Sequence, residues 1–124
     1  MDHQPRTVLV VDDDVELASM VELLLEEIGY RAVSARDGKE ALEKVAEEMP
    51  AAILLDMRMP GMNGWEFARQ FGARYDHRAP IIVLTAGEDA RKDAQEIDAD
   101  DYLGKPFEFD DLVNVLARHA PLGT

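Results

Sequence analysis

Five short apolar segments, separated by stretches with helical periodicity, constrain the fold of this 124-residue chain more than any other feature. The three clearest segments are continuous rather than alternating, and they cover residues 7–11, 51–55 and 80–84. Continuous apolar runs are typical of strands that are buried on both faces, as in a parallel sheet. Weaker runs at residues 31–34 and 101–104 are expected nearer the edge of that sheet.

The segments between these runs predict helices. Apolar residues recur at i, i+4, i+7 and i+11 within residues 15–28, and this spacing gives one apolar stripe, with Gly29 expected to end the helix. Further helices are expected from an N-cap at Asp37 and over residues 65–74, 90–97 and 110–119. Because parallel strands need such crossover connections, the sequence predicts a single three-layer α/β domain over residues 1–124, with a core at about 7–119.

Charge and composition exclude several function classes. Twenty-six Asp and Glu oppose 13 Lys and Arg, for a formal net charge of −13, so direct binding to nucleic acid or to an anionic membrane is disfavoured. The absence of cysteine excludes a disulfide framework, a thiolate zinc site, an iron–sulfur cluster and a cysteine nucleophile. The histidines His3, His77 and His119 have no metal-ligand spacing. With a polar N-terminus and no apolar run near 18 residues, a cytoplasmic location is expected.

Charged and polar side chains follow four of the predicted strands. Asp12 and Asp13 come directly after the first strand, Asp56 after the third, Thr85 at the end of the fourth and Lys105 at the end of the fifth. The carboxyl ends of parallel strands lie along one edge of a sheet, where ligand crevices form. We therefore expect these five side chains to converge on one site.

The chemistry of such a site follows from its charges. Clustered carboxylates repel one another, and Mg²⁺ relieves this by binding one or two of them together with water and phosphate oxygens. Asp56 could then act as a nucleophile that forms an aspartyl phosphate, while Lys105 neutralises charge and Thr85 donates a hydrogen bond. Taken alone, each acid also fits a turn former or N-cap, and this is the preferred interpretation for Asp14. Caps do not account for the whole set.

Four motifs together resemble the receiver domain of two-component response regulators, and single-domain chemotaxis-type regulators in particular. They are LVVDDD at residues 9–14, LLDMRMPGMNG at 54–64, VLTA at 83–86 and DYLGKPF at 101–107. The resemblance runs from about residue 7 to 119. It implies a flavodoxin-like, doubly wound, five-stranded parallel sheet with five helices and the strand order 2-1-3-4-5.

The resemblance also implies roles for individual residues. Asp56 would be the phosphoacceptor, charged by the phosphohistidine of a histidine kinase or phosphotransfer protein. Asp13, Asp56 and the backbone carbonyl of Arg58 would bind Mg²⁺ directly, and Asp12 would help through water. A chain of this kind catalyses only its own phosphorylation and dephosphorylation.

Two further residues belong to the implied switch. Thr85 and Lys105 would contact the phosphoryl group, and Tyr102 would be the aromatic residue that changes rotamer together with Thr85. The downstream protein partner would meet the fourth helix, fifth strand and fifth helix. In the family the Lys105–Pro106 bond is usually cis.

The chain departs from the family pattern near the fourth helix. The segment from Thr85 to Lys105 is shorter than usual, and Asp98 stands where a glycine is common. Within residues 90–97 the inward positions are mainly alanines, which bury little area, so this helix is expected to be short and mobile. The bulky side chain at Arg58 favours slow hydrolysis of an aspartyl phosphate.

Two other functions remain open from the sequence. An aspartyl-phosphate phosphohydrolase would share the nucleophile and Mg²⁺, and Asp12 and Asp14 have the two-residue spacing of such enzymes, but there is no cap insertion. A pseudo-receiver would have the fold without phosphorylation. A stand-alone receiver is the leading hypothesis, and a piece of a longer regulator or hybrid kinase is the alternative within the same family.

Overall fold

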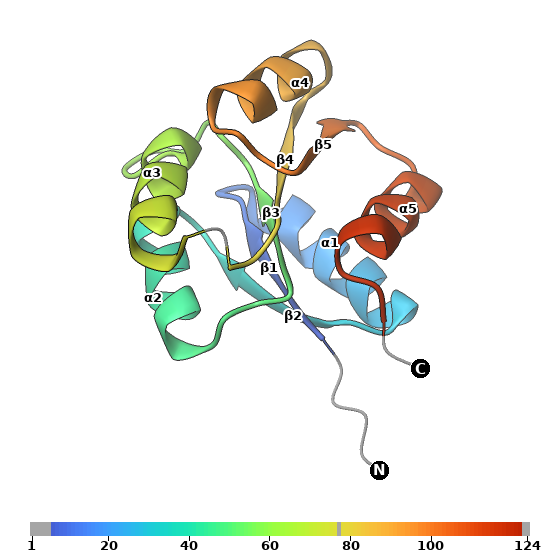
Figure 1. Cartoon of the computed structure of the whole chain (residues 1–124). Helices are drawn as coiled ribbons and strands as arrows, with labels where there is room; N and C mark the ends of the chain where they lie inside the picture. Colours follow the sequence, from blue (N-terminus) through green and yellow to red (C-terminus); the bar gives the residue numbers. More distant parts are fainter. Residues whose placement is uncertain (1–5, 77, 123–124) are drawn as a thin grey trace.

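The computed structural model describes residues 6–76 and 78–122, in which five strands and five helices alternate along the chain (Figure 1). The strands are β1 (Thr7–Val11), β2 (Arg31–Ala35), β3 (Ala52–Leu55), β4 (Ile81–Ala86) and β5 (Asp101–Lys105). The helices are α1 (Val15–Ile28), α2 (Gly38–Glu47), α3 (Gly64–Tyr75), α4 (Gly87–Glu96) and α5 (Phe109–His119).

All neighbouring strands pair in parallel, in the order β2-β1-β3-β4-β5. This is the flavodoxin-like α/β fold that the family resemblance implies. Every residue of β1 and β3 is buried, whereas the edge strands β2 and β5 are only partly buried. The weak apolar character of residues 31–34 and 101–104 therefore reflects their place at the two edges, as expected.

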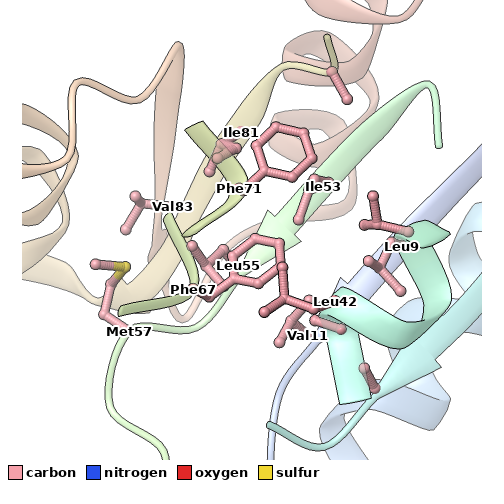
Figure 2. Packing of buried hydrophobic residues seen from close by; sticks show 14 of the residues in the cluster. Leu9, Val11, Leu42, Ile53, Leu55, Met57, Phe67, Phe71, Ile81 and Val83 are labelled. Atoms are coloured by element: carbon pink, nitrogen blue, oxygen red, sulfur yellow. The ribbon is translucent and has the colours of Figure 1, made fainter. Parts of the chain in front are cut away.

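The core lies in two layers, one on each face of the sheet. Alternate residues of β1 point to opposite faces, with Leu9 and Val11 in one layer and Val8 and Val10 in the other. Helices α2 and α3 cover the first layer and α1 and α5 the second (Figure 1). Figure 2 shows the first layer, where Phe67 and Phe71 of α3 pack beside the strand side chains.

The expected N-caps of α1 and α2 are confirmed, and α3 has an N-cap of the same kind. The side chains of Asp14, Asp37 and Asn63 each accept a hydrogen bond from the backbone N–H three residues on. Gly29 ends α1 with a φ of 124°, a conformation that favours glycine. Asp14 is therefore an N-cap, as expected.

Helix α4 begins at Gly87, three residues before the expected start at Ala90. Its N-cap position is Ala86, whose side chain makes no capping hydrogen bond, so no sequence signal marked this start. Helix α4 lies against β4 and β5 at the edge of the sheet. None of the helices in the described ranges is long and apolar enough to cross a membrane.

Candidate functional site

Three carboxylates meet at the carboxyl ends of β1 and β3. Asp12, Asp13 and Asp56 each place a carboxylate oxygen within 4.8 Å of the others. Adjacent pairing brings them together, because Val11 of β1 pairs with Leu55 of β3 and the Asp56 N–H donates to the Val11 carbonyl at 2.8 Å. Asp12 and Asp56 are buried and Asp13 is exposed. This is the acidic cluster that the strand ends predict.

Lys105 reaches this cluster from β5. Its Nζ lies 2.8 Å from Asp12 Oδ2 and 3.9 Å from Asp56 Oδ1. The other oxygen of Asp12, Oδ1, accepts from the Asp14 backbone N–H at 2.9 Å. Both Asp12 oxygens are thus engaged within the protein. The expected cis peptide bond between Lys105 and Pro106 is present.

Burial raises the pKa of Asp56 to about 6. The neighbouring carboxylates Asp12 and Asp13 also raise it, whereas Lys105 and the backbone N–H of Arg58 lower it. The single positive charge of Lys105 therefore does not neutralise the three carboxylates of the acidic cluster. An oxygen-rich cluster with uncompensated negative charge fits a small divalent cation such as Mg²⁺.

Thr85 ends the buried part of β4 on the same sheet edge. Its register partner on β5 is Gly104, directly before Lys105. The side chain is buried, and its hydroxyl oxygen accepts a hydrogen bond from Arg58 Nη1 at 3.2 Å. The hydroxyl proton is still available to a further acceptor.

The loop after β3 passes close to the start of α3. A Cβ on Gly64 would lie 2.6 Å from Met57 Sδ and 2.7 Å from Met57 Cα, so only glycine fits there without movement of the loop. Gly61 has a φ of 75°, which likewise favours glycine. These positions explain why the segment beside Asp56 is rich in glycine.

The Arg58 side chain has partners that the sequence analysis missed. Its Nη1 lies 2.6 Å from Asp93 Oδ2, and its guanidinium lies 5.2 Å from the centre of the Trp65 ring. Asp93 belongs to α4, and its side chain is only 1% exposed. The sequence held a weak signal for this pair. Asp93 lies three residues after Ala90 and one before Ala94, on the inward face of the helix, where a charged side chain needs a partner.

The remaining sequence candidates lie apart from the acidic cluster. Tyr102 on β5 is 44% exposed, so here its ring is outside the core. His119 at the end of α5 pairs with Asp101 at 2.8 Å. His3 and His77 lie outside the described residues.

A sequence model described as the response regulator receiver domain matches residues 8–117. The chain belongs to this family. Among similar solved structures is the chemotaxis protein CheY4 of Vibrio cholerae, with 31% identity, coverage of 94% of this chain and 99% of that one, and a TM-score of 0.84. This match confirms the resemblance that the four motifs gave. Receiver domains act in two-component signalling.

Two other receiver structures hold magnesium. The receiver domain of a sensor histidine kinase from Pseudomonas aeruginosa PAO1 has a magnesium ion coordinated in its active-site cleft; it is 32% identical, with coverage of 94% and 98% and a TM-score of 0.85. The response regulator TrrA of Thermotoga maritima was solved with Mg²⁺ and BeF; it is 34% identical, with coverage of 91% and 97% and a TM-score of 0.82. The acidic cluster of this receiver resembles such a Mg²⁺ site.

Proposed function

We propose that this receiver takes a phosphoryl group onto Asp56 from the phosphohistidine of a histidine kinase or phosphotransfer protein, and thereby controls a protein partner. The observation that carries the proposal is the placement of the buried Asp56 between two further carboxylates and Lys105. In the transfer, an Asp56 oxygen bonds to phosphorus as the phosphorus–nitrogen bond breaks. The imidazole nitrogen keeps the bonding electrons and takes up a proton.

The hydrogen bonds support a division of labour among the acids. Asp12 already accepts from Lys105 and from the Asp14 backbone, which fits a contact with Mg²⁺ through water. Asp13 and Asp56, with the backbone carbonyl of Arg58, would hold the ion directly. When bound, Mg²⁺ neutralises charge on the transferring phosphoryl oxygens.

Lys105 and Thr85 have complementary tasks on the phosphoryl group. Lys105 would add a positive charge beside the Asp56 oxygen, 3.9 Å from it in the free protein. The Thr85 hydroxyl would donate to a phosphoryl oxygen, because its oxygen accepts from Arg58 in the unphosphorylated protein and its proton is free to be donated. The Asp56 carboxylate must be ionised to attack, so the raised pKa of Asp56 makes cation binding part of its activation.

The surface that meets the protein partner and the cellular location stay predictions. We assign the partner surface to α4, β5 and α5, with Tyr102 as the aromatic switch residue. The chain would work as one receiver unit over residues 1–124, in the cytoplasm, without direct contact to nucleic acid. It would act on no substrate other than its own phosphoryl group.

Intact mass spectrometry tests the proposal. Acetyl phosphate with Mg²⁺ should add one phosphoryl group to the wild-type protein and none to Asp56→Asn, and chelation of Mg²⁺ should abolish the addition. Asp110→Asn, an exposed position on α5, is the matched control and should be phosphorylated like wild type. Full labelling of Asp56→Asn would overturn the assignment. Absence of labelling in wild type would favour a pseudo-receiver, and turnover of phosphate esters would favour a phosphohydrolase.

A further inference from the structure

The buried carboxylate of Asp93 on α4 depends on a single arginine from the phosphorylation site. Arg58 Nη1 donates to Asp93 Oδ2 at 2.6 Å and Nη2 donates to Oδ1 at 3.4 Å, so the guanidinium binds both carboxylate oxygens. The Asp93 side chain is 1% exposed, whereas that of Arg58 is 51% exposed. The charge on Asp93 is therefore deeply desolvated and needs this partner, because an unpaired buried carboxylate is strongly unfavourable.

The guanidinium of Arg58 also contacts Thr85 of the site and Trp65 of α3. Arg58 Nη1 also donates to the Thr85 hydroxyl at 3.2 Å, and the Trp65 ring lies 5.2 Å from the guanidinium carbon. Trp65 in turn donates from Nε1 to Glu96, at the last turn of α4, at 3.0 Å. One side chain thus joins β4, α3 and α4 at a position two residues after Asp56.

We propose that Arg58 is a latch that holds α4 in the unphosphorylated protein, and that a phosphoryl group on Asp56 competes with Asp93 for its guanidinium and so releases α4. The inference rests on the proposed phosphorylation of Asp56. A phosphoryl group carries a charge of about −1.5 to −2, and a guanidinium binds phosphate oxygens well. Arg58 is thus a positioning residue for α4, in addition to the role of its carbonyl.

Release follows from the cost of leaving Asp93 unpaired. Once the guanidinium turns toward the phosphoryl oxygens, Asp93 must regain water, and α4 has to rotate or shift outward for this. Little apolar area resists that movement, since the other buried side chains of α4 are the alanines Ala90 and Ala94. A change of charge at Asp56 is thereby converted into a movement of a helix on the surface.

Trp65 is the single tryptophan of the chain, so its fluorescence reports on this junction. In wild type, phosphorylation by acetyl phosphate with Mg²⁺ should change the Trp65 emission, because Trp65 loses its neighbouring guanidinium and its Glu96 partner. In Arg58→Met, the fraction of molecules that intact mass shows to be phosphorylated should have the same Trp65 emission as the unphosphorylated fraction. Arg58→Lys keeps the positive charge but loses the paired N–H donors of the guanidinium, so its Trp65 response should lie between those of Arg58→Met and wild type.

Two more variants keep the test decisive if Arg58→Met does not fold. Asp93→Asn removes the closer of the two α4 carboxylates that pair with Arg58, since Asp89 lies farther away at 3.9 Å. It should lose the part of the Trp65 response that comes from movement of α4. The double variant Arg58→Met/Asp93→Leu removes both charges, leaves no unpaired carboxylate and should also be unresponsive. Arg69→Met is the matched control, because Arg69 pairs with Glu66 within α3 and does not bridge to α4; it should respond like wild type.

The outcomes separate this inference from the proposed function. Intact mass measured on the same samples shows whether Asp56 carries a phosphoryl group. If wild type is not phosphorylated, the proposed function fails and the release step fails with it. If wild type is phosphorylated but its Trp65 emission stays unchanged, or if Arg58→Met and Asp93→Asn respond like wild type, the latch is overturned while the proposed function stands.

Discussion

Helices α4 and α5 flank the same edge strand, but they are held by different forces. Helix α5 buries Leu112, Val115 and Leu116 completely or nearly so, and a capping box between Glu108 and Asp111 fixes its first turn. Helix α4 has no side chain as N-cap, buries two alanines, and has a buried carboxylate paired with an arginine from the site loop.

This difference determines which helix can respond to a charge. Burial of apolar area is indifferent to a new charge at Asp56, so α5 should stay in place. An ion pair responds directly to a new charge beside one of its members, and Arg58 lies two residues from Asp56 in the chain. We therefore expect α5 to keep its position on phosphorylation and α4 to move.

The largest expected effect comes from the apolar anchor. Leu116→Ala should lower the free energy of unfolding by about 2–5 kcal/mol, since it leaves a cavity at a fully buried site. Chemical denaturation measures this change. Phosphorylation of Asp56 should persist under conditions where the variant is folded. A loss below about 1 kcal/mol would contradict the view that apolar packing holds α5.

Removal of the latch should cost less. Arg58→Met should lower the free energy of unfolding by about 1–3 kcal/mol, because it leaves the Asp93 carboxylate buried and unpaired. The exposure of the Arg58 side chain lets water reach part of the pair and limits the loss. Arg58→Met/Asp93→Leu should recover most of the stability. If the double variant is no more stable than Arg58→Met, the loss does not come from the unpaired carboxylate.

The charge at the site can be measured through pH. The folded-state pKa of Asp56 is about 6, above its ordinary value of 3.8, so the folded protein binds this proton more tightly than the unfolded chain. Asp56 therefore destabilises the metal-free protein as the pH rises from about 4 to 6. The full shift corresponds to about 3 kcal/mol, and screening by the water that reaches the open site reduces this to about 1–2 kcal/mol.

Asp56→Asn isolates this contribution. In chelator, the variant should gain stability over wild type across pH 4 to 6, and the difference should level off above pH 6. Addition of Mg²⁺ at pH 7 should remove most of the difference, since the ion stabilises the ionised carboxylate. Thermal melts of both proteins at matched pH check this. A difference that stays constant across this pH range would mean that the Asp56 pKa is not raised.

The smallest expected effect lies at the exposed end of α4. Glu96→Gln removes the charge from the exposed hydrogen bond with Trp65 but keeps an acceptor oxygen. The free energy of unfolding should change by less than about 0.5 kcal/mol. Denaturation followed by Trp65 fluorescence measures it. A loss as large as that of Arg58→Met would show that the outer contact, and not the buried pair, holds α4.

Much of the fold and the site could be predicted because both follow from local rules. Continuous apolar runs indicated the central strands, and acids placed at strand ends had to meet at one sheet edge. Asp14 and Asp37 were recognisable as N-caps from their positions. The strand order, in contrast, came only with the family resemblance.

The latch could not be predicted, because it depends on how α4 is rotated against β4. Arg58 and Asp93 are 35 residues apart and lie on a loop and a helix, so no period or motif relates them. Ala90 and Ala94 indicated a weakly packed helix, and the place of Asp93 on their face was a weak signal for its burial, but nothing in the sequence identified Arg58 as its partner.

Amide hydrogen exchange of the wild-type protein, with and without beryllofluoride and Mg²⁺, tests the difference between the two helices most directly. Both are read in the same molecule, so global stabilisation by the ligand affects them alike. We expect protection of α4, residues 87–96, to fall relative to that of α5, residues 109–119, when beryllofluoride occupies the site. Protection that rises equally in both helices, or falls in α5 and not in α4, would contradict the account.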